Sequence, residues 1–153
     1  MTFASASTAC SHNGSRVVDR DLLLRKAADI DRYLGELSEF RAIDASAYAA
    51  NWKTQRIVER TLHLAIEACM DLADHFVADR RLPVPETAAG AFLALSDSRA
   101  LDPALAGALA RMVAFRNILV HDYARLDPQI VLRVLAHDVD DIRRFRDAIL
   151  EIP

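Results

Sequence analysis

The segment 116–123 carries side chains that could cleave RNA without a metal ion. It places Arg116, Asn117, His121 and Tyr123 at the end of an otherwise apolar helical stretch. Near neutral pH, a histidine can take a proton from a ribose 2′-hydroxyl or give one to the leaving oxygen. An arginine can hold the phosphate with two parallel donors and stabilise charge that develops in the transition state. Because such chemistry needs a 2′-hydroxyl, it would be restricted to RNA.

Helical geometry keeps the arginine and the histidine of this segment apart. Asn117 and His121 share one face, so Asn117 can orient either His121 or the phosphate. Arg116 and His121 are five residues apart and point about 140° away from each other. They can border one cleft only if the helix end loosens or if a second subunit of a symmetric dimer completes the site. The alternative is a structural role, because cationic side chains interact favourably with the dipole at a helix C-terminus.

Two further polar clusters are candidate functional sites. They are His63, Glu67, Asp71 and His75, and His137, Asp138, Asp140 and Asp141. The first has a spacing of four, which drifts by about 40° per step around a helix and matches no zinc motif. We interpret it as a polar, partly solvated face that could line the same cleft. The second cluster is better explained as a solvated charged face, or as a surface that faces a protein partner, than as a catalytic group. We therefore expect no metal site and no cofactor.

The elements that position these residues are all predicted to be helices. Apolar residues recur at helical spacing, and Asp-Pro pairs signal two helix starts. The expected helices cover approximately residues 19–43, 46–80, 86–95, 103–121 and 128–149. Tyr48 and Trp52 are expected to pack the start of the second helix against the bundle rather than to stack on bases, and Arg111 and Arg125 add charge near the motif. The prediction is an all-α, antiparallel bundle of about five helices.

Composition limits the class of protein further. The chain has 153 residues, a formal net charge of −3 and only two cysteines, Cys10 and Cys69. The charge argues against bulk electrostatic gripping of long nucleic acid, and the cysteines do not make a disulfide framework. Residues 1–17 are predicted to be a disordered leader, and residues 18–153 a single domain. The leader does not look like a secretory signal, and no apolar stretch approaches the length of a membrane span, so we expect a cytoplasmic protein.

The Arg-x4-His-x-Tyr arrangement of Arg116, His121 and Tyr123, with Asn117 directly after the arginine, resembles the signature of HepT-like HEPN toxins. The stretches ERTLHLAIEACMDLADHFVADRRLPVPET and LDPALAGALARMVAFRNILVHDYARLDP are similar to that family in order, spacing and turn chemistry. The resemblance covers roughly residues 19–152.

This resemblance implies an α-helical homodimer whose Arg/His motifs face a shared cleft. It implies metal-independent endoribonuclease activity within a type II or VII-like toxin–antitoxin system, with Arg116 and His121 catalytic and Asn117 supporting. It also implies a minimal nucleotidyltransferase antitoxin, which can silence such toxins by transferring AMP to the motif tyrosine, here Tyr123. Added bulk and negative charge beside Arg116 would block RNA. The alternative is a catalytically silent HEPN protein that acts as a binding or complex-forming subunit.

Overall fold

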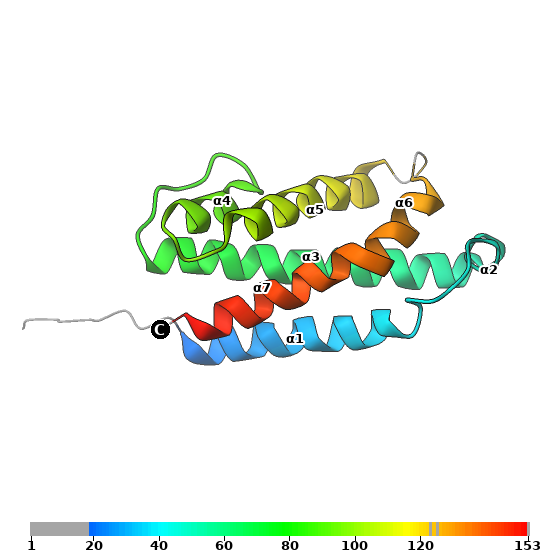
Figure 1. Cartoon of the computed structure of the whole chain (residues 1–153), viewed down its shortest axis with the longest axis horizontal. Coiled ribbons are helices and arrows are strands. Elements are labelled where there is room, and N and C mark those ends of the chain that lie inside the picture. Colours follow the sequence, from blue (N-terminus) through cyan, green and yellow to red (C-terminus); the bar gives the residue numbers. More distant parts are fainter. Residues whose placement is uncertain (1–18, 123, 125, 153) are drawn as a thin grey trace, which may run out of the picture.

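The computed structural model describes residues 19–122, 124 and 126–152, and within them every regular element is helical. The elements are α1 (Arg20–Ser38), α2 (Ala45–Ala50), α3 (Trp52–Asp79), α4 (Gly90–Asp97), α5 (Pro103–His121), α6 (Pro128–Arg133), the π-helical segment η2 (Val134–Asp138) and α7 (Val139–Glu151). The long helix α3 contacts α1, α4, α5 and α7. Figure 1 shows α5 and α1 on opposite sides of the bundle. The predicted all-α bundle is confirmed.

The core forms because each long helix buries one apolar stripe. Burying these side chains against one another removes them from water, which is the main force that holds the bundle together. The largest fully buried side chains are Tyr48, Phe76, Phe92, Phe145, Ile30, Leu37, Leu62, Ile66, Leu72, Leu95, Leu109 and Leu135.

Helix starts are set by short polar side chains that accept hydrogen bonds from backbone N–H groups. Asp102 accepts from Leu105 N at 3.0 Å, and Pro103 follows as the first residue of α5. Asp127 accepts from Gln129 N at 2.8 Å before Pro128, the first residue of α6. Both Asp-Pro starts expected from the sequence are therefore confirmed. The first of them fixes where α5, the helix with the motif, begins.

The structure corrects several predicted boundaries. The second predicted helix is broken at Asn51, whose extended backbone ends α2 and whose side chain caps α3 by accepting from two backbone N–H groups. The first helix ends at Ser38 rather than near residue 43, and α4 begins at Gly90 rather than near residue 86. The last predicted helix is divided by the π-helical turn η2, which follows α6 directly and leads directly into α7.

The two aromatic residues at the start of the second predicted helix behave differently. Tyr48 is 1% exposed and belongs to the core, as expected. Trp52 is 67% exposed, so the prediction that it packs against the bundle is wrong. The physical reason is the break at Asn51, which starts a new helix and leaves Trp52 on its first, outward-facing turn.

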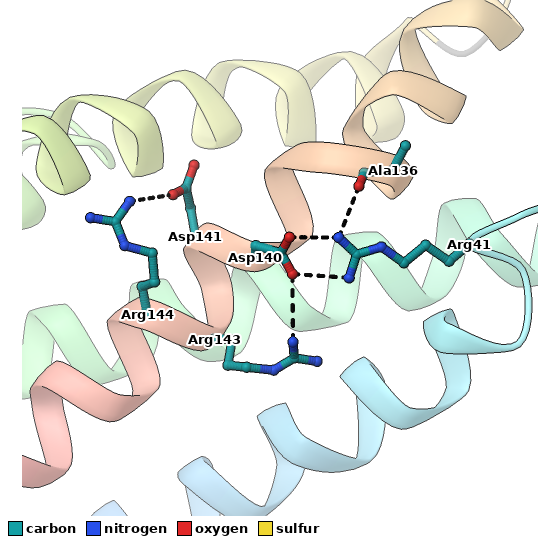
Figure 2. A network of polar contacts seen from close by, with 6 residues as sticks. All are labelled: Arg41, Ala136, Asp140, Asp141, Arg143 and Arg144. Atoms are coloured by element: carbon teal, nitrogen blue, oxygen red, sulfur yellow. Dashed lines mark hydrogen bonds and ion pairs between the residues drawn. The ribbon is translucent and has the colours of Figure 1, made fainter.

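A polar clip joins the turn after α1 to η2 and α7 (Figure 2). The Arg41 guanidinium contacts Asp140 through two hydrogen bonds of 2.9 and 2.5 Å, and also donates to the Ala136 carbonyl at 2.9 Å. The pKa of the Asp140 carboxyl is lowered, first because Arg41 hydrogen bonds to it. Asp140 therefore has a structural partner, which supports the interpretation of this cluster as a charged face.

By length and composition alone, α5 is long and apolar enough to cross a membrane, contrary to the expectation from the sequence. The same test is passed by core helices of soluble proteins, so it is weak evidence. Leu105, Leu109 and Met112 of α5 are packed in the core of the bundle. The predicted leader, residues 1–17, lies outside the described residues.

Candidate active site

The candidate site lies at the C-terminal end of α5, which stays α-helical through His121. The helix ends because Asp122 leaves the helical conformation, with φ −142° and ψ 40°, while its N–H still donates to Ile118 O at 3.0 Å. His121 is exposed on the last turn. Arg116, one turn earlier, is half-buried and turns towards α3, where its side chain finds a carboxylate.

Arg116 is held from two sides. Its Nη2 atom forms an ion pair with Glu67 Oε1 of α3, and its Nη1 atom donates to Asn117 Oδ1 at 3.1 Å. A guanidinium has five N–H donors in a rigid fork, so donors remain for a phosphate after both contacts are made. The Asn117 side chain therefore contacts the arginine of the motif.

A polar chain on α3 continues from this ion pair. His63 Nε2 lies 3.5 Å from Glu67 Oε1, and Arg60 Nη1 lies 3.2 Å from His63 Nδ1. The pKa of His63 is lowered, mainly by burial, with the positive charges of Arg116 and Arg60 adding to the effect and Glu67 opposing it. A neutral ring can accept from Arg60 at Nδ1 and donate to Glu67 at Nε2. Arg60, His63, Glu67 and Arg116 thus form one connected network.

A hollow of about 520 Å³ and a smaller one of about 290 Å³ flank α5 on different sides. The smaller hollow lies between α3 and the end of α5. It is lined by Arg56, Glu59, Arg60, His63, Leu119 and Val120. The pKa of Glu59 is raised by burial, which outweighs the opposing effect of Arg56. The smaller hollow adjoins the polar network and therefore belongs to the candidate site.

One copy of the chain does not bring Arg116 and His121 together. Because α5 remains helical through His121, the loosened helix end considered from the sequence is not observed. Within the described residues no hydrogen bond or ion pair joins the two side chains. Tyr123 and Arg125 lie outside the described residues, and Arg111 lines the larger hollow on the other side of α5. The predicted cluster of positive charge is therefore divided between two surfaces.

The two polar clusters singled out in the sequence have different structural roles. In the first, Glu67 and His63 join the Arg116 network, whereas Asp71 pairs with Lys26 of α1 at 2.6 Å. The second cluster pairs through Asp140 with Arg41. Within the part of the chain that the structure describes, no group of three or more His, Cys, Asp or Glu side chains is arranged to hold a metal ion.

Sequence reasoning missed Arg56 and Arg60 and did not connect Glu67 with Arg116. The spacing of four between His63 and Glu67 was visible, and some residues of that stripe were expected to line the cleft. The contact with Arg116 spans 49 positions of sequence, from 67 to 116, and depends on how α3 packs against α5. The signal that could have identified Arg56 and Arg60 is their spacing from His63, which places them on the same helix face.

The fold and the site together define a class: an all-α bundle that carries an Arg-x4-His motif at the end of one core helix. Comparison with known proteins identifies the family. The model of the family described as "Ribonuclease HepT-like" matches residues 30–149. The chain belongs to this family of ribonucleases, so the resemblance noted from the motif is confirmed.

Characterised relatives of the chain are named as nucleases. An "mRNA nuclease HepT" of Shewanella oneidensis is 31% identical over 129 residues, which cover 84% of this chain and 96% of that protein. A "tRNA nuclease HepT" of Aphanizomenon flos-aquae is 34% identical over 107 residues, covering 70% of this chain and 73% of that protein. The two relatives share the activity in their names but differ in the RNA that is named.

Solved structures support the same family. A toxin–antitoxin complex with AMP-PNP contains a chain with a TM-score of 0.81 at 30% identity, covering 86% of this chain and 99% of that one. A tri-AMPylated HEPN toxin of Shewanella oneidensis, in complex with its MNT antitoxin, has a TM-score of 0.80 at 30% identity and covers 86% of this chain and 98% of that one. The chain is therefore similar over nearly the whole length of both toxins.

Proposed function

We propose that this chain is the endoribonuclease toxin of a toxin–antitoxin pair and that Arg116 and His121 perform the cleavage. The observation that carries the proposal is the arrangement at the end of α5 in a member of this ribonuclease family. Arg116 is fixed by Glu67 and Asn117, and His121 is exposed to solvent on the same helix. RNA and the antitoxin would both be met in the cytoplasm, which is where we expect the protein to act.

The proposed reaction is transfer of the phosphate to the neighbouring ribose oxygen. The His121 imidazole takes the proton of the 2′-hydroxyl, and the oxygen attacks the adjacent phosphorus. The bond from phosphorus to the 5′-oxygen breaks, that oxygen takes up a proton from water, and His121 afterwards releases its proton to solvent. The products are a 2′,3′-cyclic phosphate and a 5′-hydroxyl end. Arg116 donates to the phosphate oxygens, where negative charge develops, and no metal ion is required for these steps.

We propose that the site is completed by a second copy of the chain. Arg116 and His121 point about 140° apart on a regular helix, so one subunit presents them in different directions. A two-fold axis near the end of α5 would let Arg116 of one copy face His121 of the other across a shared cleft. The proposed assembly is therefore a symmetric homodimer in which each active site contains residues from both subunits.

We further propose that a minimal nucleotidyltransferase antitoxin silences this toxin by transferring AMP to Tyr123. The support is the motif tyrosine in this sequence and the similarity to a HEPN toxin that is AMPylated in complex with its MNT antitoxin. An AMP group two residues from His121 would add bulk and negative phosphate to the site. That charge would compete with RNA for Arg116.

A second candidate function is a catalytically silent HEPN subunit that binds partners. The observation that favours it is the occupied state of Arg116, which is paired with a carboxylate and could serve the stability of the α3–α5 contact alone. The two functions share a fold and differ in whether the cleft acts on RNA.

The experiment that separates them is induction of the wild type, Arg116→Ala and His121→Ala, each without the antitoxin gene, followed by growth measurement and mapping of RNA ends. Arg111→Ala is the matched control, because Arg111 is an exposed arginine of α5 that lines the other hollow. The proposal requires that the wild type and Arg111→Ala arrest growth and leave 5′-hydroxyl ends, whereas the other two do neither. If none of the four arrests growth or leaves new RNA ends at equal soluble levels, the silent subunit is favoured.

A further inference from the structure

The N-terminal half of α3 presents an aromatic and basic surface beside the candidate site. We define the α3 basic face as Trp52, Arg56, Arg60 and His63. At 100° per residue these side chains fall within an arc of about 80° and extend over about 16 Å along the helix. Glu67, one turn beyond His63, carries the ion pair to Arg116. The α3 basic face therefore leads directly to the proposed cleavage centre.

Trp52 is the most unusual member of this face. An indole is costly to leave in water, yet 67% of this residue is exposed in the structure. The Lys53 ammonium lies 5.8 Å from the centroid of its ring, which adds a positive charge beside the aromatic surface. An exposed ring next to cationic groups can stack on an unpaired base while the cations neutralise its phosphate.

The arginines of the α3 basic face retain donors for a ligand. Within the described residues, Arg60 makes no ion pair with a carboxylate, and its one side-chain contact is with the ring of His63. Arg56 pairs with Glu59 at 3.4 Å, but 67% of its side chain is exposed, so water screens that pair. Arg56, Arg60 and His63 together line the hollow of about 290 Å³ between α3 and α5.

The spacing of these groups suits a single strand. Arg56 and Arg60 are about 6 Å apart along the helix axis. A stacked strand rises about 3.4 Å per nucleotide, so the two arginines span roughly two nucleotides. A duplex would keep its bases paired and hide their faces from Trp52, whereas unpaired bases can be splayed onto an aromatic side chain.

We propose that the α3 basic face is an RNA subsite that binds an unpaired segment flanking the cleaved bond, with Arg56 and Arg60 on phosphates and Trp52 stacked on a base. This inference rests on the proposed function, since it names how the same site holds its substrate. The site would then select single-stranded RNA. His63 orients Arg60 and links the subsite to Glu67 and Arg116.

The test is binding of a fluorescent single-stranded RNA oligonucleotide, and of the corresponding duplex, to the full-length chain carrying His121→Ala to prevent cleavage. Trp52→Ala, Arg56→Ala and Arg60→Ala are added singly. The matched control is Arg32→Ala, because Arg32 of α1 is 60% exposed, pairs with an acid three residues away as Arg56 does, and lies on a helix across the bundle from α5. Affinity is measured by anisotropy at several salt concentrations, and oligomeric state by light scattering.

We expect Trp52→Ala to weaken binding of the single strand roughly 5- to 100-fold, with partial recovery in Trp52→Phe. Arg56→Ala and Arg60→Ala should each weaken it and reduce the magnitude of the salt slope by about 0.7. Arg32→Ala should leave affinity and slope unchanged, and the duplex should bind less tightly than the single strand.

Three outcomes would overturn the proposal. The first is an affinity for the single-stranded RNA that is the same in all three variants as in Arg32→Ala. The second is binding of the duplex that is as tight as, or tighter than, binding of the single strand. The third is a change of oligomeric state in Trp52→Ala, which would make Trp52 a contact between copies of the chain. RNA cleavage by the wild-type chain is assayed in parallel and separates the two proposals. If the wild type cleaves RNA but the three substitutions leave RNA binding unaffected, only the subsite is rejected. If the chain neither binds nor cleaves RNA, the proposed function is rejected as well.

Discussion

Glu67 fixes the position of the Arg116 guanidinium through an ion pair. Arg116 reaches across from α5 to this carboxylate on α3, and Asn117 contacts the other terminal nitrogen. A long arginine side chain would otherwise sample many rotamers, and a misplacement of about 1 Å can cost about 100-fold in rate. At the scale of single residues, Glu67 is therefore a positioning residue for the proposed reaction.

We expect Glu67→Ala to lower the rate of RNA cleavage by roughly 100-fold while leaving the helical content unchanged. Glu67→Gln should recover much of the rate, because its amide oxygen can still accept from Arg116. The control is Asp71→Ala on the same helix, which removes an exposed carboxylate paired with Lys26. Initial rates on an end-labelled RNA, with circular dichroism as the check on folding, measure both. A rate for Glu67→Ala equal to that of the wild type contradicts the positioning role.

Individual residues were predictable from the sequence only where chemistry and local spacing coincide. Arg116, Asn117 and His121 stand within six positions, so a motif could indicate them, and their catalytic roles remain predictions. The Glu67 contact and the exposure of Trp52 could not be read from the sequence. The first depends on the packing of two helices far apart in the chain, and the second on a helix break one residue earlier.

At the scale of elements, helix type and order followed from apolar spacing, and starts followed where a capping aspartate precedes proline. The break at Asn51 was missed because the apolar pattern continues through it. The π-helical turn η2 was missed because one wider turn leaves almost no trace in a pattern with a period near four. The Arg41 clip is attached to this turn, since Arg41 donates to the carbonyl of Ala136 as well as to Asp140 (Figure 2).

We expect Arg41→Ala to lower the melting temperature at pH 7 by about 1–4 °C, because half-exposed ion pairs contribute at most about 1 kcal/mol. The pKa of Asp140 is lowered in the folded state from its ordinary value of 3.8. Its contribution is therefore present above pH 3.8 and is lost as the pH falls through the folded pKa. The difference between wild type and variant should shrink in that acidic range.

Thermal unfolding from pH 7 down to pH 3 measures this difference. Arg144→Ala is the control, because among the described residues Arg144 pairs with Asp141 of the same helix and with no second element. A difference that is constant over the whole range, or equal in the two variants, would show that the clip does not act through Asp140.

At the scale of the whole molecule, the regular end of α5 bears on assembly. The sequence allowed two ways for Arg116 and His121 to border one cleft: a loosened helix end or a second subunit. Since α5 stays helical through His121, the second subunit is the one that remains. The single chain could be predicted as a bundle from its sequence, because every long helix buries apolar side chains within it. The arrangement of two chains could not, because a dimer surface has no pattern of its own along the sequence.

We expect mixing Arg116→Ala with His121→Ala subunits to restore cleavage. In a mixed dimer, the intact Arg116 of one subunit faces the intact His121 of the other, so one of its two composite sites is complete. With random exchange half of the dimers are mixed, which gives about a quarter of the wild-type activity. Cleavage of a labelled RNA after unfolding and refolding the two variants together measures it.

The control is a chain that carries both Arg116→Ala and His121→Ala, mixed with the wild type. In dimers of one double-variant subunit and one wild-type subunit, no composite site contains both intact residues. Activity after mixing the two single variants that stays at the sum of the separate variants would contradict composite sites. It would also require Arg116 and His121 to act from one subunit.

The anchored state of Arg116 has a consequence for how the protein is switched. Ordering a long side chain loses rotamer entropy, and here that loss accompanies folding instead of RNA binding. A preorganised guanidinium needs no rearrangement before the first turnover, so we expect activity without a lag once an inhibitor departs. Inhibition of cleavage must then come from outside the bundle, through a group that blocks a site that is already assembled.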